Sequence, residues 1–269
     1  MNIYFDESGI HEGAKICAVA GYFGQRNAWE KLETDWRHAL EEFHLPEFHA
    51  RRFWARDGDG HRVRPYDDLD DVKAQRFFHR LLRAIKDSHI YPVGAAVVGE
   101  EWKQLDPGER RFLTGGRVEH GKFTTSGSPN KAYFLPFLQV VYRVTAYCSE
   151  GEKADFFFGL DRTFSGYARD YFKQIKKLNQ PMVFHLGEIH FPVNLETKPL
   201  QAADLLAYEV YQYAKRRLVN PSYSGNSQKE LLAALARLRN VQDDFKIFDR
   251  RGLQLALEKF RRQNPQLCS

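Results

Sequence analysis

The chain has 269 residues, a formal net charge of +5 at pH 7 and 43% hydrophobic residues. These values are typical of globular domains and exclude collagen-like and linker-like chains. No apolar run approaches the roughly 18 residues that cross a bilayer, so we expect no membrane partner. The first residues have no basic n-region and no apolar h-region, so we expect no secretory leader, and the three cysteines form no CxxC pair. This favours a cytoplasmic protein without a disulfide framework or cysteine-type zinc site, whereas composition gives no oligomeric state.

The basic charge is concentrated towards the end of the chain. From Lys215 onward there are 12 Lys and Arg residues against 5 Asp and Glu residues. Such a face suits a polyanionic partner, and nucleic acid is the first candidate. Lys215, Arg216 and Arg217 form one candidate nucleic-acid-binding run, and Arg51 and Arg52 form another. A solvated helical face without a partner is the alternative explanation for these charges.

Apolar residues along the chain alternate between strand and helix periods. In chain order they predict two strands (2–6 and 15–23), two helices (27–43 and 70–87), a strand (89–98), a helix (131–148), a strand (154–160), a helix (165–178), a strand (188–193) and three helices (198–217, 227–240 and 250–262). The first two strands are expected to form a hairpin with a turn at 7–9. Asn27 and Glu30 have the spacing of a capping box for the first helix.

Two stretches carry no such pattern. Residues 46–68 are an aromatic and basic connection, in which Phe53, Trp54 and Tyr66 lie among arginines. Aromatic residues in such a segment either stack on nucleic-acid bases or anchor the segment to the core. Residues 105–129 carry five glycines among charged residues and are expected to form a mobile loop.

The order of these elements indicates an α/β fold, a mixed β-sheet flanked by helices. Residues 1–217 are expected to form the core, with the mobile loop at about 105–129 as part of it. Residues 218–269 are expected to form a C-terminal helical extension that packs on the same domain.

Three carboxylates stand in unusual places. Asp6 ends the first predicted strand and Asp161 ends the strand at 154–160. Functional groups of open α/β sheets gather at the carboxyl ends of strands, so parallel neighbouring strands would bring both into one crevice. Asp204 falls on the apolar face of its helix, just after the small pair Ala202 and Ala203. A carboxylate on that face needs a cation, a metal ion or several hydrogen-bond donors.

Carboxylates from strand ends and a packed helix are the oxygen ligands that Mg²⁺ and Mn²⁺ prefer. Two such ions about 4 Å apart activate a water and stabilise the leaving oxygen in phosphodiester cleavage. The pattern therefore predicts Mg²⁺ or Mn²⁺ as the cofactor, held by Asp6, Asp161 and Asp204.

Four segments of the chain also resemble one family. These are YFDESG at 4–9, EFHARRFW at 47–54, FGLDR at 158–162 and PLQAADLLAY at 199–208. Together they resemble the domain-of-unknown-function 3800 family, a group of bacterial and phage proteins described as having a ribonuclease H-like fold. The resemblance spans about residues 2–215 and implies a ribonuclease H-like mixed sheet with helical additions.

The resemblance also implies roles for single residues. Asp6, Asp161 and Asp204 match the acidic metal-binding positions of ribonuclease H-like nucleases. His49 matches the histidine of the family's H-A motif, where it is expected to carry a proton or contact a phosphate. Glu7 is a further catalytic candidate because it adjoins Asp6.

The function favoured by these observations is a divalent-metal-dependent nuclease that cleaves phosphodiester bonds in DNA or RNA. Two alternatives stay open: a non-catalytic nucleic-acid or protein-binding module with the same fold, and a metal-dependent hydrolase of small phosphate compounds. Convergence of the three carboxylates would favour the nuclease. A Lys or Arg side chain in their place would favour the binding module, and a closed pocket would favour the small-phosphate hydrolase.

Overall fold

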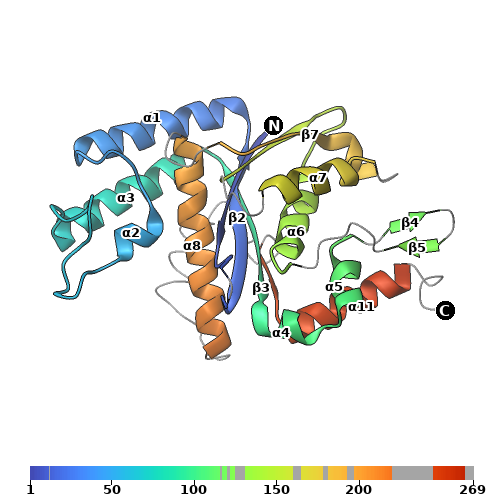
Figure 1. Ribbon diagram of the computed structural model, residues 1–269. Helices are drawn as coiled ribbons and strands as arrows, with labels where there is room; N and C mark the ends of the chain where they lie inside the picture. The colour runs from blue at the N-terminus through green and yellow to red at the C-terminus, as the bar shows by residue number, and fades with distance from the viewer. Residues whose placement is uncertain are drawn as a thin grey trace.

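The central element of the computed structural model is a six-stranded mixed sheet with helices on both faces (Figure 1). The residues that the structure describes are 1–11, 13–115, 117–119, 122–124, 131–159, 165–177, 181–192, 197–219 and 245–263. Within them, no helix is both long and apolar enough to cross a membrane. The expected α/β class is confirmed.

The sheet has the strand order β7-β6-β1-β2-β3-β8. Its strands are β1 (Asn2–Ser8), β2 (Ile16–Gly24), β3 (Tyr91–Val98), β6 (Ala154–Phe158), β7 (Leu186–His190) and β8 (Phe245–Phe248). Strands β1, β2 and β3 are antiparallel neighbours. In contrast, β6 runs parallel to β1, β7 runs parallel to β6, and β8 runs parallel to β3. The expected hairpin of the first two strands is therefore confirmed.

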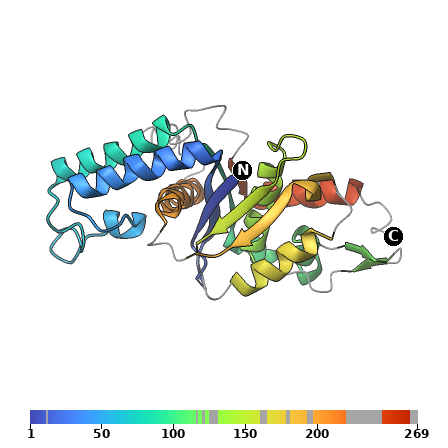
Figure 2. The ribbon, with the colours of Figure 1, turned by 90° about the horizontal axis from the view of Figure 1, so that it is seen from above.

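One face of the sheet is covered by α8 (Lys198–Val219), which packs directly on β1 and β2. Outside α8 lie α1 (Arg26–Glu42), α3 (Asp71–Asp87) and the short α2 (Ala50–Trp54). Figure 2 shows α8 in orange between the sheet and this outer layer. Small side chains at the contact, alanines on both α8 and β2, let the helix approach the strands closely.

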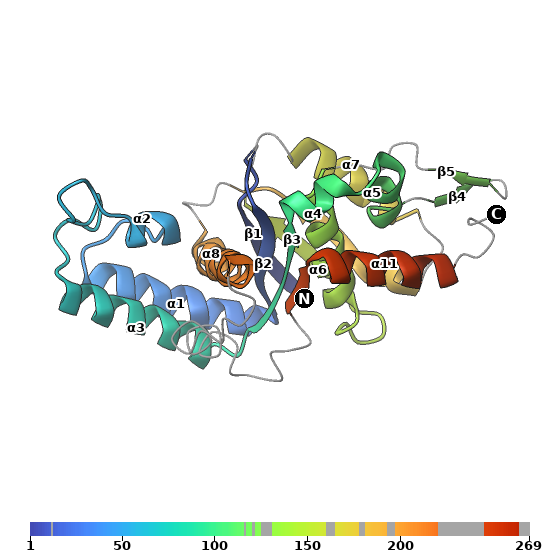
Figure 3. The same cartoon turned by 90° about the horizontal axis from the view of Figure 1, so that it is seen from below.

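The other face is covered by α6 (Phe134–Thr145), α7 (Ser165–Ile175) and α11 (Arg250–Gln263). Figure 3 shows α11 in red beside α4 and α5. Smaller elements complete this side: α4 (Gly99–Gln104), α5 (Pro107–Leu113), β4 (Arg117–Glu119), β5 (Lys122–Thr124) and the 3-10 helix η1 (Pro181–His185). Strand β2 is buried throughout because Ala18 and Ala20 face one core while Cys17 and Val19 face the other.

The helices predicted at 70–87, 131–148, 165–178, 198–217 and 250–262 are all present. The helix predicted at 227–240 lies outside the described residues. The turn predicted at 7–9 begins too early, because Glu7 and Ser8 still pair with β2. The predicted cap of the first helix is wrong: Asn27 lies inside α1, and its Oδ1 accepts from the adjacent Ala28 N at 2.9 Å.

Two further predictions need correction: the loop at 105–129 and the helical C-terminal extension. Residues 105–129 were expected as a mobile loop, yet they contain α5 and the β4–β5 hairpin. The signal overlooked there is Asp106 and Glu109, which form a complete capping box with Pro107 in the first turn. The C-terminal extension was expected to be helical, but β8 joins the main sheet beside β3. Four residues are too few for a strand pattern to stand out.

Gly9 controls how the chain leaves β1. Its φ of +74° lies in the left-handed region, and a Cβ there would stand 2.1 Å from Ile16 O and 2.7 Å from the Tyr211 ring. Gly13 in the same connection also has a positive φ, +89°, but open space around it. A substitution at Gly13 therefore adds backbone strain alone, whereas one at Gly9 adds both backbone strain and a steric clash.

We expect Gly13→Ala to cost about 1–2 kcal/mol, the strain of a Cβ in the left-handed region. Gly9→Ala should cost clearly more, because the Ile16 carbonyl and the Tyr211 ring must also move. Thermal unfolding followed by circular dichroism measures both. Equal melting temperatures for the two variants would contradict the close approach at Gly9.

Candidate active site

A cavity of about 650 Å³ lies at the carboxyl end of β1. Strand β1 contributes Asp6 and Glu7 to its lining, α2 and the residue before it contribute Arg51 and His49, and α8 contributes Asp204. Three parts of the chain that are far apart in sequence therefore meet at one cavity. Four of these five residues are the catalytic candidates of the sequence analysis, and the fifth is a predicted nucleic-acid contact.

Asp204 holds the start of α2 in place. Its Oδ2 accepts a hydrogen bond from Ala50 N at 2.7 Å and lies 3.2 Å from His49 Nδ1, in an orientation off a straight hydrogen bond. The Asp204 side chain is only 14% exposed. Its expected position on a buried face is confirmed, and its neighbours here are a histidine and a backbone N–H.

The same contact changes the acidity of His49. The interaction with the Asp204 carboxylate is the largest cause that raises the pKa of the imidazole above its ordinary value, and burial opposes it. The negative charges of Asp204 and Asp6 add to the rise, whereas Arg52 lowers the pKa. Asp6 thus lies close enough to His49 to act on it electrostatically. Because Nδ1 faces Asp204, Nε2 is the nitrogen left for other partners.

Two further residues position His49: sequence reasoning missed Gln201, and it named Tyr66 only as a stacking or anchoring aromatic residue. The Oε1 atom of Gln201 accepts from Trp36 Nε1 at 2.9 Å and from Phe48 N at 3.0 Å. The hydroxyl of Tyr66 accepts from His49 N at 2.7 Å. Gln201 is 2% exposed. The available signal was its place one turn before Asp204 on the same apolar face of the helix.

Asp6 is 5% exposed and ends the buried part of β1. The parallel alignment that the sequence analysis required is present, because β6 runs beside β1 and Gly159 N donates to Phe5 O at 3.0 Å. Strand β6 ends at Phe158, opposite Phe5, whereas β1 continues to Ser8. Asp161, the predicted third ligand, lies outside the described residues.

The predicted basic residues do not all reach the cavity. Arg51 and Lys215 line it. Arg52 lies 3.6 Å from Glu47 as an ion pair, and the Arg217 guanidinium stands 5.9 Å from the centre of the Tyr213 ring. Like Lys215 and Arg217, Arg216 is exposed near the end of α8.

The aromatic residues of the 46–68 segment are mainly anchors. Phe53 and Tyr66 are 1% and 0% exposed, so neither offers a face to a base. Trp54 is 38% exposed. Two other aromatic residues, Tyr208 and Tyr211, do line the cavity, although the sequence analysis had not singled them out.

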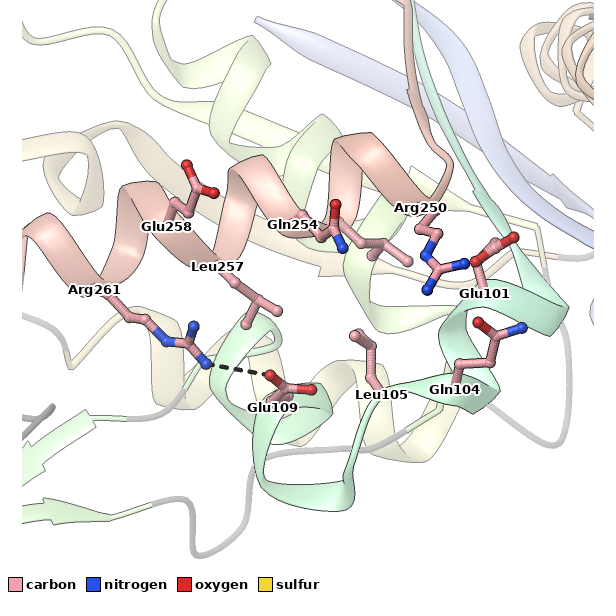
Figure 4. A pocket seen from close by; sticks show the side chains of 10 residues that line it. Glu101, Gln104, Leu105, Glu109, Arg250, Gln254, Leu257, Glu258 and Arg261 are labelled. Atoms are coloured by element: carbon pink, nitrogen blue, oxygen red, sulfur yellow. Dashed lines mark hydrogen bonds and ion pairs between the residues drawn. The ribbon is translucent and has the colours of Figure 1, made fainter.

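A second cavity, of about 520 Å³, lies between α4, α5 and α11 (Figure 4). Its wall carries an ion pair between Arg261 and Glu109 at 3.2 Å, drawn as a dashed line. None of the predicted site residues that the structure describes lines it. The cavity at the end of β1 is therefore the candidate active site.

Over the described ranges, no group of three or more His, Cys, Asp or Glu side chains is gathered closely enough to hold a metal ion. The structure describes two of the three predicted ligands, Asp6 and Asp204, and both line the same cavity. Comparisons with protein-family models, curated proteins and solved structures found no match for this chain. The function is therefore argued from the residues of the cavity.

Gln201 gives a direct test of how the site is held. Gln201→Leu removes the acceptor of two buried donors, Trp36 Nε1 and Phe48 N, so we expect a loss of about 2–4 kcal/mol in unfolding free energy. Denaturant unfolding measures it. Gln75→Leu on the exposed face of α3 is the control and should stay within about 0.5 kcal/mol of wild type. A Gln201→Leu protein as stable as that control would rule out the anchoring role.

Proposed function

We propose that the protein is a divalent-metal-dependent nuclease that hydrolyses phosphodiester bonds in DNA or RNA. The observation that carries the proposal is the meeting of Asp6, Glu7, His49 and Asp204 at one cavity. Arg51 and Lys215 add positive charge to the same lining, as a polyanionic substrate requires. We also infer a cytoplasmic location from the cysteine usage.

We further propose that the core is ribonuclease H-like and that the chain is a member of the domain-of-unknown-function 3800 family. Three consecutive antiparallel strands, extended beyond the first by two parallel strands, are the arrangement we expect of such a core. The four segments that resemble the family also support it. YFDESG, EFHARRFW and PLQAADLLAY supply residues to the cavity, although they are distant in sequence.

The donor chemistry of the cavity fits a hard divalent cation. Asp6, Glu7 and Asp204 offer carboxylate oxygens, and Mg²⁺ needs only one or two protein carboxylates because it keeps several waters. Two or more carboxylates in one cavity repel each other unless a cation lies between them. In our proposal Asp6 and Asp204, with Asp161, hold the ion. When bound, Mg²⁺ or Mn²⁺ supplies Lewis-acid stabilisation of the phosphate charge and a water activated for attack.

The remaining roles belong to the chain's own side chains. Asp204 and Tyr66 fix the position of His49, so the imidazole can hold or deliver a proton through Nε2. Arg51 and Lys215 are the cations of the lining that can bind non-bridging phosphate oxygens. Binding and proton transfer thus fall to different residues.

We expect cleavage of single- or double-stranded DNA or RNA in the presence of Mg²⁺ or Mn²⁺, and none in EDTA. Asp6→Asn should lower the rate by at least about 100-fold, the scale of losing one charge-stabilising group. A gel-based panel of the four substrates measures it. Glu188→Gln is the matched control, since Glu188 is 74% exposed and pairs with Lys176 at 2.8 Å away from the cavity. Activity that survives EDTA or Asp6→Asn would exclude the proposed nuclease.

Metal binding gives a second test that is independent of turnover. Asp6→Asn and Asp204→Asn should each weaken Mn²⁺ binding, because each removes one negative charge from the cavity. Calorimetric titration measures the affinity, and Mn²⁺ should raise the melting temperature of the wild type, since a ligand bound only to the native state stabilises it. Unchanged Mn²⁺ affinity in both variants would contradict a metal site formed by Asp6 and Asp204.

Two observations bear on the alternatives. Asp204 Oδ2 already accepts a backbone hydrogen bond, as a purely structural carboxylate would, which favours a non-catalytic binding module. The volume of the cavity, about 650 Å³, is that of a small-molecule pocket, which favours a hydrolase of small phosphate compounds. Nucleic-acid binding without cleavage in the presence of any divalent metal ion would support the non-catalytic binding module. Release of phosphate from nucleotides, with polynucleotides untouched, would support the small-phosphate hydrolase.

A further inference from the structure

Helix α8 presents one continuous stripe of side chains to the cavity. Asp204, Tyr208, Tyr211 and Lys215 follow each other at spacings of four, three and four, and all four line the cavity. This spacing places them on one face of a helix. The stripe, which we call the α8 track, starts at the carboxylate beside His49 and ends at a cation. At 1.5 Å per residue it is roughly 16 Å long.

The two rings of the α8 track are partly exposed. The Tyr211 ring packs closely on Gly9, where a Cβ would stand 2.7 Å from the ring. The Lys215 Nζ lies 6.0 Å from the centre of the same ring. Tyrosines on the wall of a cavity that also carries Arg51 and Lys215 combine flat apolar faces with positive charge.

We propose that the α8 track binds single-stranded nucleic acid, with unpaired bases stacked on Tyr208 and Tyr211 and backbone phosphates held by Lys215 and Arg51. The inference rests on the proposed function and adds its substrate class, a single strand in preference to a duplex. Alternating aromatic faces and cations are what unpaired strands require. The two rings lie three residues apart on α8 and offer stacking positions for two neighbouring bases.

A duplex does not suit the same lining. Its bases are already stacked and paired, so a side chain inside a cavity reaches their faces only after the strands open. Stacking on a tyrosine ring and contact with a backbone phosphate are equally available to every base. We therefore expect binding that tolerates any sequence and depends strongly on salt.

The first experiment uses the wild-type protein in EDTA, so that cleavage plays no part. Fluorescence anisotropy is measured with labelled oligo-dT and oligo-U of equal length, and with a blunt DNA duplex and a blunt RNA duplex of that length. We expect each single strand to bind at least tenfold more tightly than the duplex of the same chemistry. Duplex binding as tight as single-strand binding would overturn the proposal.

The second experiment tests the rings. Tyr208→Leu and Tyr211→Leu should each weaken single-strand binding about tenfold, whereas Tyr208→Phe should keep it, because stacking needs the ring and not the hydroxyl. Tyr213→Leu is the control on the same helix, since Tyr213 does not line the cavity. Equal losses in Tyr213→Leu and Tyr208→Leu would overturn the proposal. If a leucine variant does not unfold cooperatively, stacking is measured instead by the quenching of 2-aminopurine in a bound single strand, with the wild type and Tyr208→Phe. The absence of quenching would also overturn the proposal.

Lys215 is tested by salt. Lys215→Ala should reduce the slope of log affinity against log salt by about 0.7, the value for one phosphate contact on a single strand. Arg217→Ala should change it less, because the Arg217 guanidinium lies over Tyr213. These readouts need no metal and no cleavage. Single-strand binding without nuclease activity would therefore overturn the proposed function but not the role of the α8 track. Nuclease activity without preferential single-strand binding would overturn the role of the α8 track alone.

Discussion

The arrangement of the site depends on three consecutive backbone N–H groups. Those of Phe48, His49 and Ala50 donate to the side chains of Gln201, Tyr66 and Asp204, respectively. A segment outside regular structure is thereby fixed at each successive residue, which offsets the entropy that ordering it costs. His49 consequently stands beside the end of β1 without being part of the sheet. The position of the candidate proton carrier is set by α8 together with Tyr66.

Helix α8 can hold the segment around His49 because its buried face carries both small and polar side chains. Small side chains let it lie close to β1 and β2, while Gln201 and Asp204 place polar atoms in an otherwise apolar layer. Buried polar groups of this kind destabilise a fold unless they are hydrogen-bonded. Their donors come from the segment around His49 and, for Gln201, also from Trp36 Nε1. Burial of the polar groups of α8 is therefore coupled to the ordering of that segment.

The sequence was sufficient for the fold class, the β1–β2 hairpin and most helices, because long apolar patterns depend only on local spacing. It also indicated Asp204, since a carboxylate on an apolar face is conspicuous by itself. It did not reveal Gln201, nor the contact of the Tyr66 hydroxyl with His49 N, because these contacts form only through tertiary packing. The capping box at Asp106 was readable but was obscured by the surrounding glycines, and β8 is stable as a strand only because β3 lies beside it.

The charges of the cavity are ordered along α8. Asp204 begins the stripe of side chains, with His49 beside it and Asp6 near that histidine, and Lys215 ends the stripe. A phosphate backbone is attracted to the cationic end and repelled from the acidic end until a divalent ion neutralises the carboxylates. In our proposal, binding of a strand and its approach to the acidic end of the cavity are therefore separate electrostatic events. In our proposed function the metal ion controls the second of them, which confines cleavage to the end of the cavity where His49 lies.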